Sequence, residues 1–269
     1  MTSVFESLMA AQKLVSRSEA RILLAATLKK SKEFLIAHPE TELSREEESL
    51  FGMYLDRAHK GEPIPYITGV QEFWGRPFCV TPATLIPRPD TETLIEHALN
   101  FLRQKPTSRV LDLGTGSGCI AVTLALECPQ ACIWACDISS QALCIAKHNS
   151  HTLGAAVSFI ESDWFGAFEN ETFDLIVSNP PYIEEADEHL KALTYEPISA
   201  LTSGADGLND IRKLAASAPK HLRSDGCIIV EHGYNQGPSV AAIFRQSGFS
   251  NVHTIQDLGG NPRICCARN

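Results

Sequence analysis

The spacing of apolar residues divides the chain into two parts. In the first sixty residues, apolar positions recur three and four residues apart, the spacing of one face of an α-helix. The stretch from Ser44 to Glu47 is a capping box, which is typical of a helix start, and Gly61 ends the pattern. Residues 19–30 carry a second amphipathic pattern. These patterns predict a small helical module.

Residues 61–88 differ in character, because proline, glycine and aromatic residues replace the helical repeat. Such a density of helix and strand breakers is typical of a linker. Two short runs, 78–80 and 84–86, predict the strands of a small β-hairpin. We therefore expect a linker with a hairpin between the two parts of the chain.

The larger part begins with a helical stripe over residues 94–102 and then alternates strand and helix. Its apolar runs are short and continuous, as in strands buried on both faces, and helical segments separate the first five. This alternation predicts a doubly wound α/β sheet with ligands at the carboxyl ends of its strands. Only residues 258–262 join the last two strands, so these should form an antiparallel hairpin. The seven expected strands are residues 109–114, 132–138, 157–163, 173–179, 227–233, 251–257 and 263–268.

Composition fits one large domain with a small companion, because the chain has 269 residues, of which 44% are hydrophobic. Lys and Arg number 23 against 32 Asp and Glu, a net charge of −9, and residues 86–269 carry −8 of it. The chain therefore lacks the positive field that gathers nucleic-acid phosphates. No apolar run approaches the ~18 residues needed to span a bilayer, and the first residues do not have the pattern of a secretory signal. We expect a cytoplasmic protein that binds neither nucleic acid directly nor membranes.

Nine cysteines, an odd number in a chain too long to need disulfides, are typical of reduced thiols. The spacing of Cys128, Cys132 and Cys136 resembles that of a metal site. However, the run around them is a predicted strand, in which residues four apart lie roughly 13 Å from one another. That separation is too large for a shared ion. We predict small buried apolar thiols and no metal.

A glycine-rich turn follows the first predicted strand of the larger part and opens a helix. Glycines let the backbone approach a ligand closely, and a helix N-terminus offers free N–H groups, so the turn predicts a nucleotide or cofactor cradle. Its Gly-x-Gly-x-Gly spacing differs from the dinucleotide fingerprint. Asp112, just before it, can brace the turn. The turn consists of Gly114, Thr115, Gly116, Ser117 and Gly118.

Acidic residues end the next two strands. Asp137 follows Gly116 by 21 residues, and its carboxylate either accepts hydrogen bonds from ribose hydroxyls or caps the helix that begins at Ser139. Asp163 and Trp164 end the third strand, where a carboxylate and a large ring can bind and cover an adenine. A ring that fills the core is the alternative, but the register of Trp164 with the glycine turn favours binding.

The fourth strand runs into Asn179, Pro180, Pro181 and Tyr182. The two prolines remove two N–H donors, and Pro180 forces Asn179 into an extended conformation, so the turn presents carbonyl oxygens. A planar NH2 group can donate one hydrogen to the Asn179 side-chain oxygen and the other to the Pro180 main-chain oxygen. An ordinary proline turn is the alternative, but it does not explain an Asn in line with a cofactor cradle.

Together these residues resemble a class I S-adenosylmethionine-dependent methyltransferase that modifies a planar nitrogen. Four further stretches narrow the resemblance to the bacterial peptide chain release factor glutamine methyltransferases. The match covers essentially the whole chain, with no departure in the motif residues. The four stretches are Gly61 to Gly69, Glu72 to Gly75, Leu85 to Glu92 and Tyr195 to Leu201.

The resemblance implies a Rossmann-like sheet of seven strands with an antiparallel C-terminal hairpin, plus a small N-terminal helical domain. Residues 1–74 are then the domain that recognises the substrate, 75–89 the linker with the hairpin, and 90–269 the methyltransferase domain. The implied reaction moves a methyl group from S-adenosyl-L-methionine to the side-chain nitrogen (N5) of the glutamine in the Gly-Gly-Gln motif of release factors. S-adenosyl-L-homocysteine is the second product, and the enzyme is expected to be a monomer.

The same resemblance implies a role for each motif. The glycine turn holds the methionine end of the cofactor, Asp137 holds the ribose, and Trp164 beside Asp163 holds the adenine. Asn179, which also binds the cofactor, grips the target amide together with Pro180, and Pro181 and Tyr182 shape its slot.

An amide nitrogen is a poor nucleophile, and no side chain in these motifs is a base strong enough to deprotonate it. Catalysis should therefore rest on positioning, which can supply roughly 7–11 kcal/mol of a barrier. Carbonyl acceptors add to this by stabilising the positive charge that develops on nitrogen. His232 is interpreted as a structural histidine, and residues 88–92 are expected to help close the site.

Two alternatives share the Asn-Pro-Pro-Tyr turn, namely a glutamine methyltransferase that acts on a ribosomal protein and an adenine-N6 DNA methyltransferase. The negative charge of residues 86–269 disfavours DNA. A nicotinamide-dependent oxidoreductase is opposed by the glycine spacing. Residues 183–210 form either a lid or a partly helical segment packed around Leu190 and Leu193.

Overall fold

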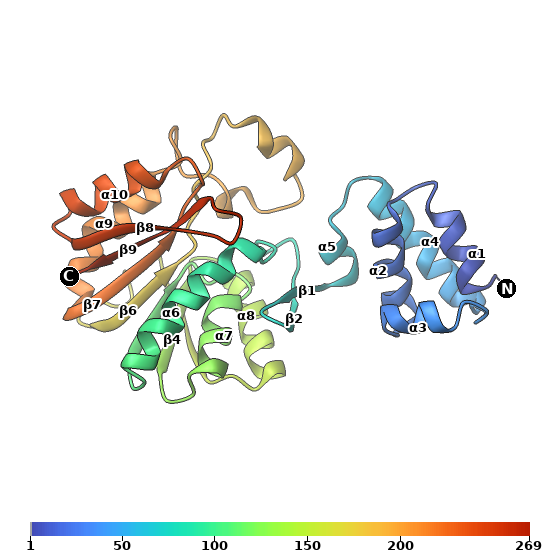
Figure 1. Ribbon diagram of the computed structural model, residues 1–269, viewed down its shortest axis with the longest axis horizontal. Helices are drawn as coiled ribbons and strands as arrows, with labels where there is room; N and C mark the ends of the chain where they lie inside the picture. The colour runs from blue at the N-terminus through green and yellow to red at the C-terminus, as the bar shows by residue number, and fades with distance from the viewer. Residues whose placement is uncertain (1) are drawn as a thin grey trace. The chain divides into compact units, whose positions relative to one another are not determined.

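The computed structural model describes residues 2–269, and Met1 lies outside the described part. The chain divides into two compact units, one that ends at Val70 and one that runs from Gln71 to Asn269. The first unit is helical, as predicted. Its helices are α1 (Val4–Ala11), α2 (Arg17–Leu28), α3 (Lys32–Ala37), α4 (Arg45–His59) and α5 (Ile64–Thr68) (Figure 1).

Serine side chains begin four of these helices. The Glu47 amide donates to Ser44 Oγ at 3.2 Å, and the Ser44 amide donates to the Glu47 carboxylate at 2.8 Å, which confirms the predicted capping box. The same reciprocal pair opens α1 and α2, and Ser31 caps α3. The helices pack around a core that includes Val4, Leu23, Leu24, Leu43 and Phe51.

The second unit is built on a mixed sheet of seven strands in the order β5-β4-β3-β6-β7-β9-β8 (Figure 1). The strand β3 pairs in parallel with both β4 and β6, and the chain winds outward from it in two directions. The strand β9 is antiparallel to both β7 and β8, so the seven strands and the C-terminal hairpin are confirmed. The strands are β3 (Arg109–Leu113), β4 (Cys132–Asp137), β5 (Val157–Glu161), β6 (Phe173–Ser178), β7 (Leu222–Glu231), β8 (Ser250–Gln256) and β9 (Pro262–Arg268).

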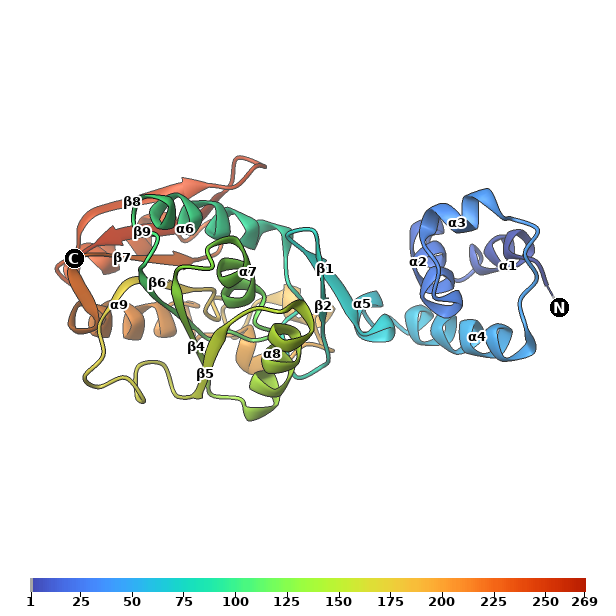
Figure 2. The same cartoon turned by 90° about the horizontal axis from the view of Figure 1, so that it is seen from below.

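Alternate residues of the central strands pack on opposite faces of the sheet. Val110 and Leu175 belong to a core covered by α6 and α7, whereas Leu111 and Ile176 belong to a core covered by α9 and α10. Figure 2 shows α6 and α9 on opposite sides of the strands. Among residues 2–269, no helix has the length and apolar character that crossing a membrane requires. The helices are α6 (Glu92–Gln104), α7 (Cys119–Glu127), α8 (Ser140–Leu153), α9 (Asn209–His221) and α10 (Gly237–Gln246).

The predicted position of the hairpin was wrong. The two-stranded sheet pairs β1 (Val70–Phe73) with β2 (Arg76–Cys79). Between them Trp74 and Gly75 both have positive φ angles, 52° and 68°, as a tight two-residue hairpin turn requires. The prediction followed the apolar runs and therefore placed both strands too late in the chain. The residue that marks the turn is Gly75.

The expectation of helices between all of the first five strands was also wrong at one connection. Residues 162–172, between β5 and β6, form turns. Phe165 and Phe168 from this connection are buried in the core that α9 covers. The Phe168 ring packs edge-on against Trp134 and Phe173, with centroids 6.4 and 5.7 Å away. Aromatic rings therefore fill space on this face that a crossover helix would otherwise cover.

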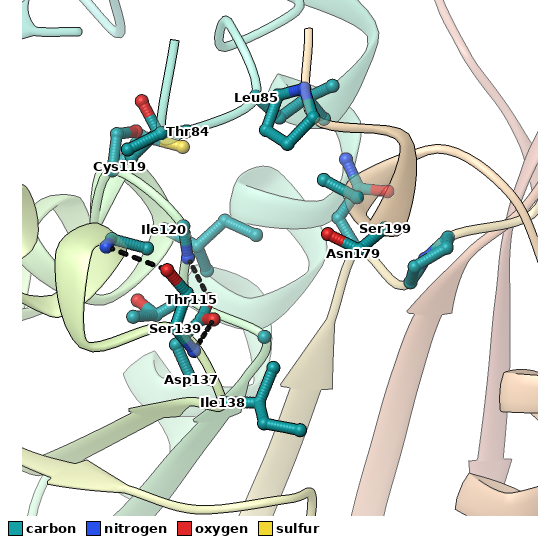
Figure 3. Close-up of a pocket in the computed structure, with 18 of the residues that line it drawn as sticks. Thr84, Leu85, Thr115, Cys119, Ile120, Asp137, Ile138, Ser139, Asn179 and Ser199 are labelled. Atoms are coloured by element: carbon teal, nitrogen blue, oxygen red, sulfur yellow. Dashed lines mark hydrogen bonds between the residues drawn. The ribbon is translucent and has the colours of Figure 1, made fainter. Parts of the chain in front are cut away.

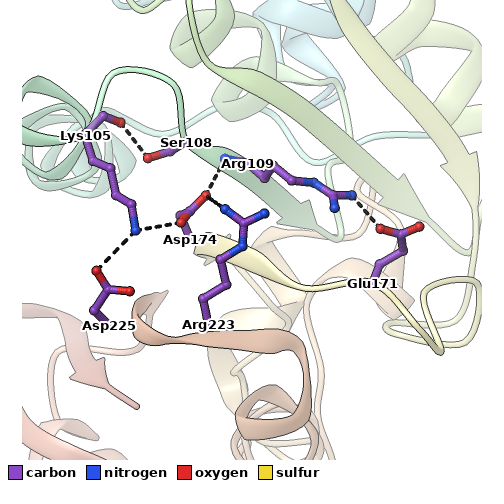
Figure 4. Close-up of polar contacts among 7 residues, drawn as sticks. All are labelled: Lys105, Ser108, Arg109, Glu171, Asp174, Arg223 and Asp225. Carbon is purple, nitrogen blue, oxygen red and sulfur yellow. Dashed lines mark hydrogen bonds and ion pairs between the residues drawn. The ribbon is translucent and has the colours of Figure 1, made fainter.

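A buried carboxylate joins the strands at the amino end of β6 (Figure 4). Asp174 has a side chain only 1% exposed. It accepts hydrogen bonds from the Arg109 main-chain N and Arg223 Nη1, both at 2.8 Å, and pairs with Lys105 Nζ at 2.7 Å. Burial alone would raise its pKa, but these donors together lower the pKa below the ordinary value. The network therefore links β3, β6, β7 and the end of α6.

We predict that Asp174→Ala lowers the free energy of unfolding by roughly 2–4 kcal/mol, because it leaves partly buried cations and a main-chain amide without their acceptor. The matched control is Asp225→Ala, which removes a carboxylate that is 71% exposed and pairs with the same Lys105. That variant should cost less than about 0.5 kcal/mol. Urea unfolding measures both, and equal losses would show that Asp174 is not the centre of the network.

The same network has a defined pH dependence. Because the folded-state pKa of Asp174 is lowered, its contribution is complete above the ordinary pKa of 3.8 and is lost as the pH falls through the folded value. The difference in unfolding free energy between wild type and Asp174→Asn should therefore be largest near neutral pH and shrink below about pH 4. Urea titrations at a series of pH values measure this difference, and a constant difference would refute the assignment.

Candidate functional site

A cavity of about 580 Å³ lies at the carboxyl ends of β3, β4, β5 and β6 (Figure 3). This is the edge of the sheet where the sequence predicted a ligand, and the volume suits a small-molecule ligand. Nine of the predicted site residues line it, and Gly118, Pro180 and Tyr182 do not. The nine are Gly114, Thr115, Gly116, Ser117, Asp137, Asp163, Trp164, Asn179 and Pro181.

The glycine turn is held against the neighbouring strand. The amides of Gly114 and Thr115 both donate to Cys136 O at 2.9 Å. Asp112 braces the turn from within, since its Oδ2 accepts from the Thr115 hydroxyl at 2.6 Å and from the Ala121 amide at 3.2 Å. Burial raises the pKa of Asp112 to about 7. The turn is therefore a preformed part of the fold.

Glycine is required at the last position of this turn. Gly118 has a φ of +82°, and a Cβ built there would lie 3.0 Å from Ala146 Cβ and 3.2 Å from Ala146 Cα in α8. Any side chain would push α7 and α8 apart. Gly118 therefore has a packing role, which explains why it lies outside the cavity lining.

Asp137 connects the glycine turn with the start of α8 on one side of the cavity. Its Oδ2 accepts from the Gly116 amide and its Oδ1 from the Ser139 amide, both at 2.9 Å. The cap of α8 is Ser139, whose hydroxyl accepts from the Ala142 amide at 3.1 Å. Burial is the largest effect on the Asp137 carboxyl and raises its pKa. Asp137 thus presents a carboxylate to the cavity, whereas capping the helix falls to its neighbour.

Trp164 covers the opposite side of the glycine turn. Its ring lies 3.4 Å from the position that a Cβ on Gly114 would occupy. Trp164 has a φ of +49°, uncommon for a residue with a large side chain, and this places the ring over the turn and not deeper in the core. The half-buried ring and the exposed Asp163 both line the cavity.

Asn179 reaches the cavity from the end of β6. The preceding Ser178 donates its hydroxyl to Leu113 O at 2.7 Å, which ties β6 to β3 just below the site. Asn179 Nδ2 donates to Thr91 Oγ1 at 3.2 Å, so its Oδ1 is the atom left to accept from a ligand. Pro181 lines the cavity, whereas Pro180 is buried beneath it. Tyr182 turns away and donates its hydroxyl to Glu231 Oε1 at 3.2 Å.

Part of the remaining lining comes from segments that the sequence assigned to a linker and a loop. Residues 82–91 and residues 197–200 both contribute to the lining. The side chain of Glu196, which is 2% exposed, holds the first segment beside the second. Its carboxylate accepts from the Ile86 amide at 3.2 Å and pairs with Arg88. Residues 183–210 are partly helical, with the helical turns η2 (Glu188–Ala192) and η3 (Ile198–Ala200). The proline-rich composition of 82–89 identified a linker but did not reveal that it walls the cavity.

Two predictions about reactive side chains can be compared with the structure. His232 is fully buried away from the cavity, Nδ1 lies 2.8 Å from Gly233 O and burial lowers its pKa, as expected of a structural histidine. Cys136 is buried, and Cys128, at the end of α7, is half-buried. Cys132 is exposed, so the prediction that it is buried was wrong. Within residues 2–269, no three His, Cys, Asp or Glu side chains gather as a metal site requires.

Comparison with known families divides the chain in a similar way. Residues 3–69 match the family described as PrmC N-terminal domain, and residues 90–204 match the Methyltransferase small domain. The release factor glutamine methyltransferase of Salmonella typhimurium is 44% identical over 255 residues, which cover 94% of this chain and 92% of the relative.

Two solved structures resemble parts of the chain. The release factor-specific protein-(glutamine-N5) methyltransferase of Alicyclobacillus acidocaldarius is 32% identical, with a TM-score of 0.45, over 71% of this chain and 99% of its own. A 16S rRNA N2 methyltransferase of Thermus thermophilus, solved with AdoMet and guanosine, is 18% identical, with a TM-score of 0.52, over 74% of this chain and 49% of its own. The second likeness supports the fold alone.

We predict that Gly118→Ala destabilises the protein by about 1–3 kcal/mol more than Gly154→Ala. Both glycines have similar φ angles, +82° and +75°, so both variants bear the strain of a left-handed alanine. Only at Gly118 does the added methyl meet another backbone. Apart from its two chain neighbours, a Cβ at Gly154 would have no heavy atom within 4 Å. Thermal and urea unfolding compare the two, and similar losses would refute the packing role of Gly118.

Proposed function

The chain belongs to the release factor glutamine methyltransferase family, and from this premise we propose that it methylates the N5 amide nitrogen of the glutamine in the Gly-Gly-Gln motif of release factors. The methyl donor in this proposal is S-adenosyl-L-methionine. The observation that carries it is Asn179, whose amide oxygen is free at a cavity that also presents Asp137 and Trp164. The same cavity is thus lined by an amide oxygen that can accept a hydrogen bond, a carboxylate and an aromatic ring.

The donor groups around the cavity suit the proposed cofactor. The carboxylate of Asp137 can accept from two ribose hydroxyls, and Trp164 offers a ring face to the adenine. Ile138, 67% exposed beside Asp137, adds an apolar surface on the same side.

Positioning by the protein accounts for the chemistry. When bound, the cofactor supplies an electrophilic methyl carbon attached to a sulfonium. Asn179 Oδ1 accepts one hydrogen of the target NH2 group, and in our proposal the Pro180 carbonyl accepts the other, which directs the nitrogen lone pair at that carbon. Alignment of this kind can supply roughly 7–11 kcal/mol of the barrier. The same oxygens stabilise the positive charge that grows on nitrogen until its proton leaves to water.

We also propose that the helical unit recognises the protein substrate. A groove of about 190 Å³ on this unit is lined by Phe5, Met9 and Ile36 together with Arg17 and Arg21. The three apolar side chains are 52–63% exposed, which is unusual enough to suggest an interaction surface. The enzyme is proposed to act as a cytoplasmic monomer.

Nucleic acid is a poor candidate for the substrate. The net charge of residues 86–269 is −8, which disfavours the phosphate contacts on which DNA or RNA binding depends. A ribosomal protein with an accessible glutamine is the nearer alternative, because the chemistry at Asn179 would be the same. The choice between protein substrates therefore depends on recognition outside the cavity.

The proposal predicts that label from methyl-labelled S-adenosyl-L-methionine enters a release factor when release factors, ribosomal proteins and DNA are offered together. Mass spectrometry should place the added methyl on the Gly-Gly-Gln glutamine. Asn179→Ala should lower transfer by at least ~100-fold, since it removes an acceptor for the target amide, while cofactor affinity by calorimetry stays within about threefold. Label in a release factor whose glutamine has been changed, or in DNA, would overturn the assignment.

The recognition role predicts that Phe5→Ala combined with Met9→Ala raises KM for the release factor by roughly fivefold to thirtyfold. The affinity for the cofactor should not change, because both residues belong to the helical unit. Leu258→Ala is the matched control, since this side chain is 98% exposed but lies in the other unit. An unchanged KM in the double variant would contradict a recognition role for this groove.

A further inference from the structure

The orientation of the Asn179 amide decides whether the proposed site can work. Its oxygen and nitrogen are similar in size, so the side chain can flip, but only one orientation offers an acceptor to the target amide. Thr91 Oγ1 accepts from Asn179 Nδ2 at 3.2 Å and thereby selects the useful orientation. The question is what keeps the Thr91 hydroxyl an acceptor.

The Thr91 hydroxyl is almost fully buried, at 2% exposure. It has one proton, and if it accepts from Asn179 that proton should go to a second acceptor. The Glu231 carboxyl is fully buried at the carboxyl end of β7, and its Oε2 has no hydrogen-bond partner among residues 2–269. Burial raises the pKa of this carboxyl, and the nearby Thr91 side chain acts to lower it. Strands β6 and β7 are neighbours in register, with Ser178 opposite Val230, so Glu231 and Asn179 follow paired residues.

A second hydroxyl converges on the same carboxyl group. Tyr182, the last residue of the Asn-Pro-Pro-Tyr turn, donates its hydroxyl to Glu231 Oε1 at 3.2 Å. Glu231 itself lies outside the cavity lining. The last residue of the turn thus binds Glu231 directly, and the first binds Thr91, whose side chain lies near the Glu231 oxygen that has no partner.

We propose that Glu231 is a positioning residue, which holds Thr91 and Tyr182 as donors and so keeps the Asn179 amide oxygen toward the target nitrogen. This inference rests on the proposed function and deepens it. Glu231 lies outside the cavity lining and Thr91 belongs to it, and in this proposal both act through Asn179. Glu231 was not among the candidates from the sequence, which identified its neighbour His232 instead, and Thr91 was included only as one of residues 88–92, expected to help close the site.

The charge of Glu231 determines whether the network is intact. An ionised carboxylate only accepts, whereas the protonated form donates and competes with the Thr91 proton. Burial raises the pKa of Glu231 to about 7, so the acceptor form is lost as the pH falls through neutrality. Transfer should fall with it. The groups that face Glu231 are Thr91, Tyr182, Arg263, Asp90 and Cys119.

The test compares kcat, KM and cofactor affinity for Thr91→Val, Thr91→Ser and Glu231→Gln. Thr91→Val should lower kcat by at least about tenfold with cofactor affinity within about twofold, because one hydrogen bond to Asn179 is lost. Thr91→Ser should restore most of the activity. Thr93→Val, at a buried threonine in the first turn of α6, is the matched control and should retain wild-type kcat. Wild-type kcat in Thr91→Val would overturn the proposal.

The pH profile supplies a readout that a merely structural role would not move. In wild type, kcat should decline on the acid side with a midpoint near 7, and Glu231→Gln should remove this limb because its amide does not titrate. The same limb in folded Glu231→Gln would overturn the proposal.

A third readout separates this inference from the proposed function, because it needs no substrate. The Asn179 side-chain NH2 resonances should titrate with the same midpoint in wild type and stay constant in Glu231→Gln. If the resonances titrate in wild type and stay constant in Glu231→Gln, but wild type transfers no methyl group, the methylation proposal alone is refuted. Resonances that do not respond to pH in wild type would refute the network.

Discussion

The close packing of the glycine turn against α8 is the constraint on which the site depends. A side chain at Gly118 would meet the backbone of Ala146, so the helix α7 can begin where it does only with glycine at that position. This start sets the path of the turn, whose amides reach Cys136 O and the Asp137 carboxylate. The floor of the cavity is therefore fixed by backbone contacts, and side chains are left free to meet a ligand.

The two ends of the sheet use buried carboxylates in opposite ways. At the amino ends, Asp174 is surrounded by cations and an amide, and its pKa is lowered. At the carboxyl ends, Asp112, Asp137 and Glu231 are met mainly by neutral donors, and burial raises the pKa of each. The first arrangement stabilises the fold. The second keeps under-compensated acceptors beside the cavity, where a ligand or a hydroxyl network can use them.

Sequence patterns predicted the elements with the strongest periodicity. All seven strands and the capping box at Ser44 were found from local spacing, because each buries a regular set of apolar residues or satisfies its own amides. Residues 88–92 were expected at the site only from the resemblance, and Arg88 and Thr91 line the cavity. The wall formed by residues 82–87 was not found, since its position depends on Glu196, more than a hundred positions away. Glu231 and the contact between Thr91 and Asn179 were missed for the same reason, because only the fold brings these residues together.

The most direct measurement is a crystal structure of the chain with S-adenosyl-L-homocysteine. The cavity geometry predicts ribose hydroxyls within hydrogen-bond distance of the Asp137 carboxylate, the adenine against the Trp164 ring and the sulfur facing Asn179. Product bound outside this cavity, or with its sulfur turned away from Asn179, would contradict the proposed site.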